Sequence, residues 1–255
     1  MKRLLITFGC SWTYGVGASY TQGMSQDEYK ETAWDIEKCE QLSFRGLLSK
    51  KYGFLNKNFA SGGSSNQRQF RLAKEFFSSL EFEQLKSEFN KIIVLWGITS
   101  TARNEMWSLE LDKLSNFFYH SQQTKLAKSL LKFCYNHDHE VRQLSTEMRH
   151  WNIFFKNLNI DNLWFDTFNH HDYEPTVENL IFEDKSPRDL LSTLVMAHGL
   201  KNPDNRYHHS LWTVDSNRVE YLVNNGILNP FSHHPTQQGH EQLADMLSSS
   251  LESIL

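Results

Sequence analysis

The sequence predicts an α/β fold, a three-layer α/β/α sandwich around a parallel sheet. Two short and almost wholly apolar runs, residues 4–8 and 91–96, have the composition of strands that helices cover on both faces. Glycine follows each run, at Gly9 and Gly97, so each strand should end in a turn. Amphipathic stretches with capping residues alternate with the runs, which favours parallel strands joined by helices.

The elements can be placed in chain order. Residues 18–40 are polar and predict a long loop, and a helix over residues 40–52 places Phe44, Leu47 and Leu48 on one face and ends at Gly53. Ser61 to Asn66 supply turn residues and the start of the next helix. Strands are expected at 4–8, 54–59, 91–96 and 162–168, and helices at 40–52, 67–80, 187–198 and 236–255.

Two segments interrupt this alternation. Between about residues 106 and 158 the pattern is mostly helical, so we expect a helical insertion there, whereas residues 199–232 show no regular pattern. No internal repeat, Gly/Ser linker or low-complexity tract divides the 255 residues. A single domain over residues 1–255 is therefore expected.

Charge and cysteine content restrict the partners and the compartment. The formal charge is −4 without a basic cluster, which argues against nucleic acid and favours a neutral or modestly polar small substrate. Cys10, Cys39 and Cys134 lack any C-x-x-C spacing, so neither a disulfide framework nor a structural zinc is expected. The first apolar run is shorter than a signal peptide requires, and no window resembles a membrane span. We expect a cytoplasmic protein with no membrane partner; the sequence does not indicate its oligomeric state.

Two distant segments carry a serine and a histidine. Ser11 follows the first strand, and His234 precedes the last helix, where Pro235 keeps it out of helical geometry. A serine hydroxyl is a weak nucleophile that needs an adjacent base, usually histidine. Ligands of parallel sheets bind at the carboxyl ends of the strands, where Ser11, Gly63 and Thr99 should converge. The alternatives are a helix-capping Ser11 and an ordinary surface histidine.

Four short blocks are spread over nearly the whole chain. They are Gly9-Cys10-Ser11-Trp12, Asn58-Phe59-Ala60-Ser61-Gly62-Gly63, Trp96-Gly97-Ile98-Thr99-Ser100, and His234-Pro235-Thr236 with Gly239-His240. Together these blocks resemble those of the SGNH hydrolases, also called the GDSL-type esterase and lipase family. The resemblance implies a flavodoxin-like sandwich in which Ser11 is the nucleophile and His234 the general base. It also implies that the N–H groups of Ser11 and Gly63 form an oxyanion hole, and it requires no cofactor.

Two departures from the family pattern concern the nucleophile and the oxyanion hole. Cys10 replaces the usual aspartate before the serine, and we expect it to be a buried small residue rather than a thiolate nucleophile. Thr99 stands where the family has an asparagine that donates to the oxyanion. Loss of such a donor can cost about 10²–10³ in rate. Thr99 itself, Ser100 or Asn66 are the candidates to replace it.

The third departure concerns the base, because Phe231 stands where the family has the aspartate that orients the histidine. Asp166, at the end of the fourth predicted strand, is the candidate third member of a triad. A backbone carbonyl could instead hold the imidazole, and Asp166 would then cap a loop. Arg103, in the loop after the third strand, is a candidate for binding an anionic substrate group, with a solvated arginine as the alternative.

Metal and nucleotide sites were considered and are not expected. Histidine pairs offer ligands that suit zinc or iron, but adjacent side chains point apart and no H-E-x-x-H motif accompanies them. Residues 9–17 lack both the G-x-G-x-x-G spacing and the Walker lysine. The pairs are His137-Asp138-His139, His170-His171-Asp172, His208-His209 and His233-His234.

The sequence therefore predicts a serine esterase that removes a short acyl group, such as acetyl, from a small-molecule or carbohydrate ester through an acyl-serine intermediate. Two alternatives stay open. One is a catalytically weakened relative that binds a glycan or a protein in the same crevice, which the departures at Thr99 and Phe231 motivate. The other is an acyltransferase that uses the same Ser11 and His234.

Overall fold

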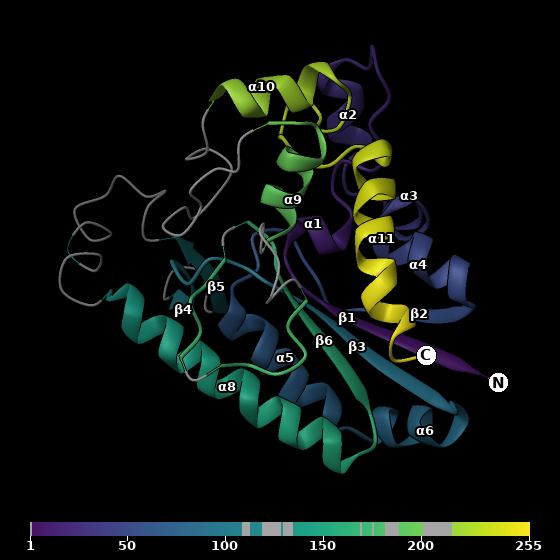
Figure 1. Cartoon of the computed structure of the whole chain (residues 1–255), viewed down its shortest axis with the longest axis vertical. Helices are drawn as coiled ribbons and strands as arrows, with labels where there is room; N and C mark the ends of the chain where they lie inside the picture. Colours follow the sequence, from purple (N-terminus) through teal and green to yellow (C-terminus); the bar gives the residue numbers. More distant parts are fainter. Residues whose placement is uncertain are drawn as a thin grey trace.

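The molecule is built on a parallel sheet of four strands, in the order β2-β1-β3-β6 (Figure 1). The computed structural model describes residues 2–108, 113–118, 129, 135–168, 170–174, 176–181, 189–200 and 216–255. The strands are β1 (Arg3–Phe8), β2 (Phe54–Asn58), β3 (Lys91–Ile98) and β6 (Asp161–Asp166). This confirms the α/β fold, and the strand order corresponds to the flavodoxin-like arrangement.

Helices cover both faces of the sheet and complete the three layers (Figure 1). Successive side chains of a strand point to opposite faces. Leu4 and Ile6 of β1 accordingly pack with one set of helices and Leu5 with the other. The first face carries α5 (Asn66–Phe77), α6 (Leu80–Glu88) and α8 (His137–Asn157); the second carries α4 (Phe44–Tyr52), α9 (Leu190–Ala197), α10 (Ser216–Asn224) and α11 (Gln237–Glu252).

The register of the strands brings their carboxyl ends together. Phe8 pairs with Trp96, and Ile98 pairs with Asp166, so the carboxyl-terminal ends of β1, β3 and β6 lie next to one another at one end of the sheet. The segments that leave these strands therefore begin side by side. The most important is the short α1 (Ser11–Tyr14), which starts three residues after β1.

Three parts of the structure differ from the sequence-based expectation. The predicted loop over residues 18–40 contains α2 (Gln26–Thr32) and most of α3 (Ile36–Leu42), which begin at capping residues Ser25 and Asp35. The helix predicted from residue 40 is interrupted at Ser43, which is extended and caps α4. The irregular region 199–232 contains α10, and α6 follows the predicted end of the second helix.

The expected helical insertion over residues 106–158 begins differently. An antiparallel pair, β4 (Arg103–Ser108) and β5 (Lys113–Phe118), occupies its first part, whereas α8 supplies the expected helix in its last part. Most of residues 119–134 lie outside the described part of the chain, as does His208-His209. In the described residues, no helix is long and apolar enough to cross a membrane. The single-domain organisation stays a prediction.

Candidate active site

Ser11 is the first residue of α1, directly after the turn that follows the carboxyl-terminal end of β1. Cys10 is the N-cap residue of α1, and its side chain makes no capping hydrogen bond. Ser11 occupies the first helical position, and its hydroxyl bonds to a histidine instead of capping the helix. The helix ends after one turn at Gly15, whose φ of +105° only glycine adopts without strain. The position of the Ser11 side chain is thus set by β1 before it and by the one-turn helix α1, which ends at Gly15.

The structure brings Ser11 and His234 together although 223 residues separate them. The Ser11 Oγ and the His234 Nε2 lie 2.7 Å apart. A histidine that accepts the serine proton at Nε2 must carry its own hydrogen on Nδ1. The spacing and orientation are those of a nucleophile and its general base.

The segment that carries His234, residues 229–236, is here called the histidine loop. The Asn229 N–H donates to the His234 carbonyl at 2.9 Å and closes the loop, and His233 adopts a left-handed φ of +55° inside it. Thr236 ends the loop and caps α11. Gly17 allows the loop to approach, because a Cβ there would lie 2.8 Å from the His234 Cβ and 2.5 Å from the Pro235 oxygen. The absence of a side chain at Gly17 therefore allows the histidine loop to pack closely against this segment.

The Nδ1 atom of His234 faces a hydroxyl and not a carboxylate. Ser232 Oγ lies 2.9 Å from Nδ1. Asp166 is not brought to His234: its carboxylate accepts hydrogen bonds from the Tyr173 hydroxyl at 2.6 Å and from the His171 N–H at 3.0 Å. Asp166 therefore caps a loop, which is the alternative that the sequence left open. The sequence did not identify Ser232 as the partner of the His234 imidazole.

Phe231, which stands where the family has its aspartate, packs in an aromatic cluster. Its ring lies 5.9 Å from Tyr20 and 5.7 Å from Tyr29, centroid to centroid. Edge-to-face and tilted contacts of this kind stabilise aromatic pairs. Position 231 therefore anchors the histidine loop through packing, and the polar support of His234 comes from the next residue.

Burial and charge both disfavour a protonated His234. Its pKa is lowered to about 4, chiefly by burial and also by the charges of Arg103 and His233, against the opposing effect of a hydrogen bond to the Ser232 main chain. A base with a low pKa is neutral, and able to accept a proton, over nearly the whole working pH range. It is also a weaker base than an imidazole supported by a carboxylate.

The main-chain N–H groups of Ser11 and Gly63 are the candidates to bind an oxyanion at the carboxyl-terminal ends of the strands. The Ser61 N–H donates to the Gly9 carbonyl at 3.2 Å, which holds the loop of Gly63 against the turn of Ser11. Gly63 has a left-handed φ of +66°. Within the described part of the chain, the N–H groups of Ser11 and Gly63 donate to no protein acceptor. Free, fixed N–H groups are what an oxyanion hole needs.

Thr99 and Asn66 are joined by two hydrogen bonds. The Thr99 N–H donates to the Asn66 side-chain oxygen at 2.9 Å, and the Asn66 side-chain amide donates to the Thr99 carbonyl at 2.8 Å. Asn66 therefore fixes the end of β3 to the start of α5, and the side-chain amide that was a candidate donor to the oxyanion of the substrate bonds to Thr99 instead. The Thr99 hydroxyl is buried and has no partner in the described residues.

Arg103 is buried beside the site and is not a solvated side chain. Its guanidinium carbon lies 5.0 Å from the Phe168 ring centroid. Burial lowers its pKa, opposed by a hydrogen bond and the charge interaction with Cys10. Cys10 itself is fully buried, as expected. Arg103 brings positive charge close enough to lower the pKa of His234.

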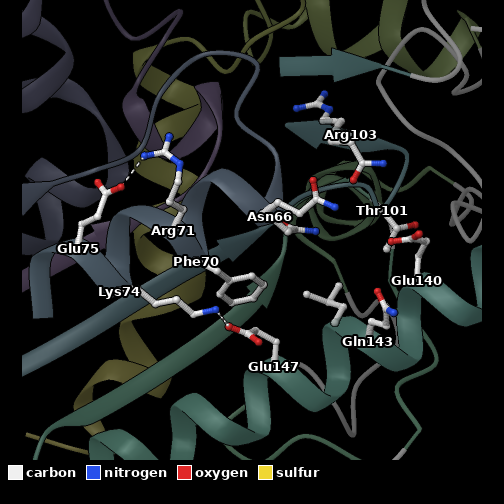
Figure 2. Close-up of a pocket in the computed structure, with 13 residues that line it drawn as sticks. Asn66, Phe70, Arg71, Lys74, Glu75, Thr101, Arg103, Glu140, Gln143 and Glu147 are labelled. Carbon is white, nitrogen blue, oxygen red and sulfur yellow. Dashed lines mark hydrogen bonds and ion pairs between the residues drawn. The ribbon is translucent and has the colours of Figure 1, made fainter. Parts of the chain in front are cut away.

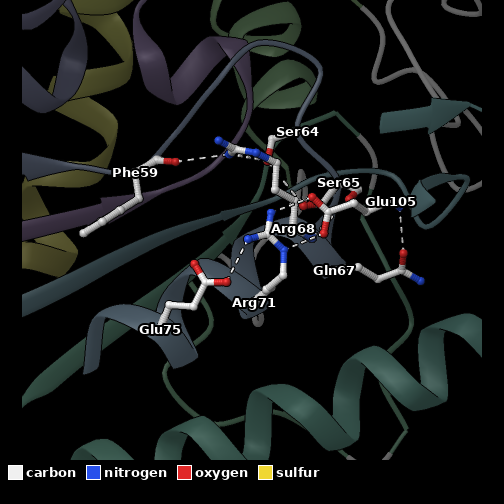
Figure 3. Close-up of polar contacts among 8 residues, drawn as sticks. All are labelled: Phe59, Ser64, Ser65, Gln67, Arg68, Arg71, Glu75 and Glu105. Carbon is white, nitrogen blue, oxygen red and sulfur yellow. Dashed lines mark hydrogen bonds and ion pairs between the residues drawn. The ribbon is translucent and has the colours of Figure 1, made fainter. Parts of the chain in front are cut away.

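A groove of about 500 Å³ lies between α5 and α8, and its lining includes Asn66, Thr101 and Arg103 but neither Ser11 nor His234 (Figure 2). The charged groups along it are largely paired. Lys74 and Glu147 lie 2.7 Å apart across the groove (Figure 2). Figure 3 shows Arg71 on the side of α5, bonded to Glu75 at 2.9 Å and to both oxygens of Glu105 at 2.7 and 2.8 Å. The lining of the groove is more apolar than polar, and its described ion pairs leave little net charge.

The histidine clusters make no metal centre in the described residues, where no group of three or more His, Cys, Asp or Glu side chains could hold an ion. His137 instead lies within 3.3 Å of the Thr101 hydroxyl. His171 is buried, and burial lowers its pKa to about 3. His240 accepts a hydrogen bond from the Phe44 N–H at 3.3 Å, which is the structural role expected of it.

No family model and no curated protein matches the chain. Solved structures that resemble it include GDSL-type lipolytic proteins and a carbohydrate esterase. A lipase/acylhydrolase from Enterococcus faecalis is 11% identical, with 100% of this chain and 97% of that chain covered and a TM-score of 0.39. An acetyl xylan esterase from Butyrivibrio proteoclasticus is 10% identical, with a TM-score of 0.44, and the match covers 98% of this chain and 64% of that one. Likenesses this distant say nothing about which residues react, so the chemistry has to be argued from the side chains.

Proposed function

We propose that the protein is a serine esterase that removes a short acyl group from a polar alcohol, through an acyl-serine intermediate on Ser11. The observation that carries the proposal is the 2.7 Å contact between Ser11 Oγ and His234 Nε2, at the strand edge where ligands of parallel sheets bind. The free N–H groups of Ser11 and Gly63 support it.

The reaction follows from these groups. Ser11 Oγ attacks the ester carbonyl carbon as its proton moves to His234 Nε2, and the carbonyl oxygen becomes an oxyanion that accepts from the two N–H groups. The tetrahedral intermediate collapses, the C–O bond to the alcohol breaks, and His234 gives its proton to the leaving alcohol oxygen. Water then attacks the acyl-serine, its proton passes to His234, and the carboxylic acid leaves as Ser11 recovers its hydrogen.

The groove between α5 and α8 supports a neutral, hydroxylated alcohol. Two of its lining residues lie close to the site, Asn66 through its hydrogen bonds to Thr99 and Arg103 through its effect on His234, and its described ion pairs offer hydrogen-bonding groups without a strong net charge. The ring of Phe70 lines one wall and gives an apolar surface on which a sugar ring can lie. A carbohydrate acetyl ester fits these features, and its alcohol part would occupy the groove.

The decisive experiment identifies the nucleophile without requiring the natural substrate. The protein is labelled with a fluorophosphonate, and mass spectrometry locates the adduct. We expect one adduct, on Ser11, and none in a Ser11→Ala variant. Ser87→Ala is the matched control, because Ser87 is an exposed serine on α6 whose hydroxyl bonds only within that helix. Labelling elsewhere, or equal labelling of wild type and Ser11→Ala, would overturn the proposal.

Turnover is measured separately with a chromogenic acetyl ester. Hydrolysis that disappears in Ser11→Ala supports an esterase, whereas labelling of Ser11 without hydrolysis indicates an acyltransferase or a weakened binding protein. Adding acceptor alcohols and measuring how the acyl group divides between water and alcohol separates the last two. Equal rates of hydrolysis by wild type and Ser11→Ala would rule out the proposed esterase activity at Ser11.

A further inference from the structure

We propose that the hydroxyl of Ser232, held by Tyr29 and Asn229, is the group that orients His234 in place of the missing carboxylate. The inference rests on the proposed function, in which His234 is the base for Ser11. Ser232 touches neither Ser11 nor the expected substrate position and acts through the imidazole, so it is a positioning residue. The resulting arrangement is a serine–histidine–serine triad whose third member is neutral.

The hydrogen atoms of this network can be assigned by counting donors and acceptors. A His234 that accepts from Ser11 at Nε2 must donate from Nδ1, and Ser232 Oγ lies 2.9 Å away to receive that hydrogen. Ser232 Oγ also lies 2.7 Å from the Tyr29 hydroxyl and 3.0 Å from the Asn229 side-chain oxygen. A hydroxyl has one hydrogen and two lone pairs, so it can satisfy three partners.

One assignment satisfies all three partners of the Ser232 hydroxyl. The Asn229 side-chain oxygen can only accept, so Ser232 donates its hydrogen there, where the same oxygen also accepts two main-chain N–H groups. The Tyr29 hydroxyl then donates to Ser232 and itself accepts from the Asn229 side-chain amide at 3.4 Å. Ser232 Oγ is left with one lone pair, which faces Nδ1. The hydroxyl is thereby held as an acceptor toward His234, which is the role that a carboxylate has in the family pattern.

The orientation of Asn229 is fixed by the main chain and not by this network alone. Its side-chain oxygen accepts from the Phe231 N–H at 3.2 Å and from the Ser232 N–H at 2.8 Å, while its amide donates to the His234 carbonyl at 2.9 Å. Asn229 is fully buried. If the Asn229 amide were turned around, its NH₂ group would face the N–H groups of Phe231 and Ser232, donor against donor. The side-chain oxygen therefore keeps the position in which it accepts the hydroxyl hydrogen of Ser232.

A competing acceptor is the Ser232 main chain, which also contributes a hydrogen bond to His234. Replacing Ser232 by alanine removes the hydroxyl and leaves this main-chain group in place. The side chain and the main chain of one residue can therefore be separated by a single substitution. Ser232→Thr keeps the hydroxyl and serves as the conservative variant.

The test compares Ser232→Ala, Ser232→Thr and Tyr29→Phe with wild type, using the chromogenic ester and the fluorophosphonate. We expect Ser232→Ala to lower kcat about 10- to 100-fold, because general-base assistance contributes about 10²–10⁴-fold and part of it is retained. KM should stay within about twofold, since Ser232 does not touch substrate, and Ser232→Thr should restore most of kcat. Tyr29→Phe should show a smaller loss in kcat, because Asn229 still holds the hydroxyl.

Ser19→Ala is the matched control: Ser19 is a buried serine whose hydroxyl donates to the Thr32 carbonyl at 3.1 Å, away from His234. If it lowers kcat as much as Ser232→Ala does, the effect is structural and the inference fails. If wild type is labelled at Ser11 but Ser232→Ala reacts equally fast, the main chain orients His234 and only this inference is overturned. If wild type is not labelled at Ser11, the proposed function falls and the inference falls with it. If Ser232→Ala does not fold, unchanged kcat in Tyr29→Phe overturns the inference.

Discussion

Gly17 offers a direct test of how closely the histidine loop must approach Ser11. A methyl group at this position would lie 2.5 Å from the Pro235 oxygen, 2.8 Å from the His234 Cβ and 2.9 Å from the Asn229 side-chain nitrogen. Ordinary contacts begin at 3.4 Å. Gly17→Ala should therefore push the loop back by about 0.9 Å at the tightest contact. A misplacement of about 1 Å can cost about 10² in rate.

The substitution also strains the backbone, because Gly17 has a φ of +96°. An alanine in a left-handed conformation costs about 1–2 kcal/mol. Gly23→Ala is the matched control, since Gly23 has a similar φ of +89° but nothing within 4 Å of the added methyl group. Both variants should lower the melting temperature by several degrees, at about 2–4 °C per kcal/mol for a chain of this size.

The assay compares kcat/KM for the acetyl ester in both variants, together with thermal unfolding. We expect kcat/KM of Gly17→Ala to fall about 100-fold and that of Gly23→Ala to stay close to wild type. Equal activities in the two variants would refute the reasoning, because they would show that displacement of the histidine loop does not matter for the chemistry. A loss of activity that simply follows the loss of stability in both variants would refute it as well.

Three further predictions concern the pH dependence of activity, the role of Asp166 and the pH dependence of stability. The acid limb of kcat/KM should lie near pH 4, because His234 must be neutral to act as a base and its pKa is lowered to about 4; a limb near pH 6.5 would contradict this. Asp166→Asn should keep kcat within about threefold, because Asp166 bonds to Tyr173 and His171 and not to His234; a loss of about 10²-fold would contradict it. Stability should fall as pH drops below 6.5, by roughly 1 kcal/mol per pH unit for each of His171, His234 and His240, measured as urea midpoints between pH 7 and 5.

The sign of the last prediction follows from the proton balance. The three histidines have lowered pKa values in the folded protein, so below pH 6.5 the unfolded chain binds more protons and is favoured. The loss stops near pH 3–4, where the folded protein is protonated as well. Asp166 acts in the opposite sense, since burial raises its pKa. Midpoints that do not change between pH 7 and 5 would contradict the prediction.

The fold could be predicted because its strands are continuous apolar runs. Ile92, Ile93, Val94 and Leu95 have no exposed face in a three-layer sandwich, so their pattern identifies β3 without ambiguity. The meeting of Ser11 and His234 could also be predicted, because both follow from their places beside the sheet edge. What failed were segments without strong periodicity: α2 and α3 begin at the capping residues Ser25 and Asp35, and residues of these types are also favoured in turns, so they do not by themselves indicate a helix.

The support of His234 could not be predicted for a different reason. Ser232, Asn229 and Tyr29 are ordinary polar residues, and Tyr29 comes from a helix some 200 positions away along the chain. A hydroxyl can accept, donate or do both, so its role depends on which partners surround it. An aspartate at position 231 would have been recognisable from its type alone, whereas a serine is recognised only when its three partners are placed.

The replacement of a carboxylate by a hydroxyl changes where charge is stabilised in the proposed reaction. Ser232 orients the imidazole but carries no charge, and the nearby Arg103 disfavours an imidazolium. Proton transfer to His234 is therefore less favourable than in a triad with aspartate. In the proposed reaction the same positive charge should favour the oxyanion on the substrate, because charge interactions are strong in a buried setting. Arg103 is therefore expected to oppose one of the two charges that form at attack and to favour the other, in a site that lacks both the aspartate and the asparagine of the pattern it resembles.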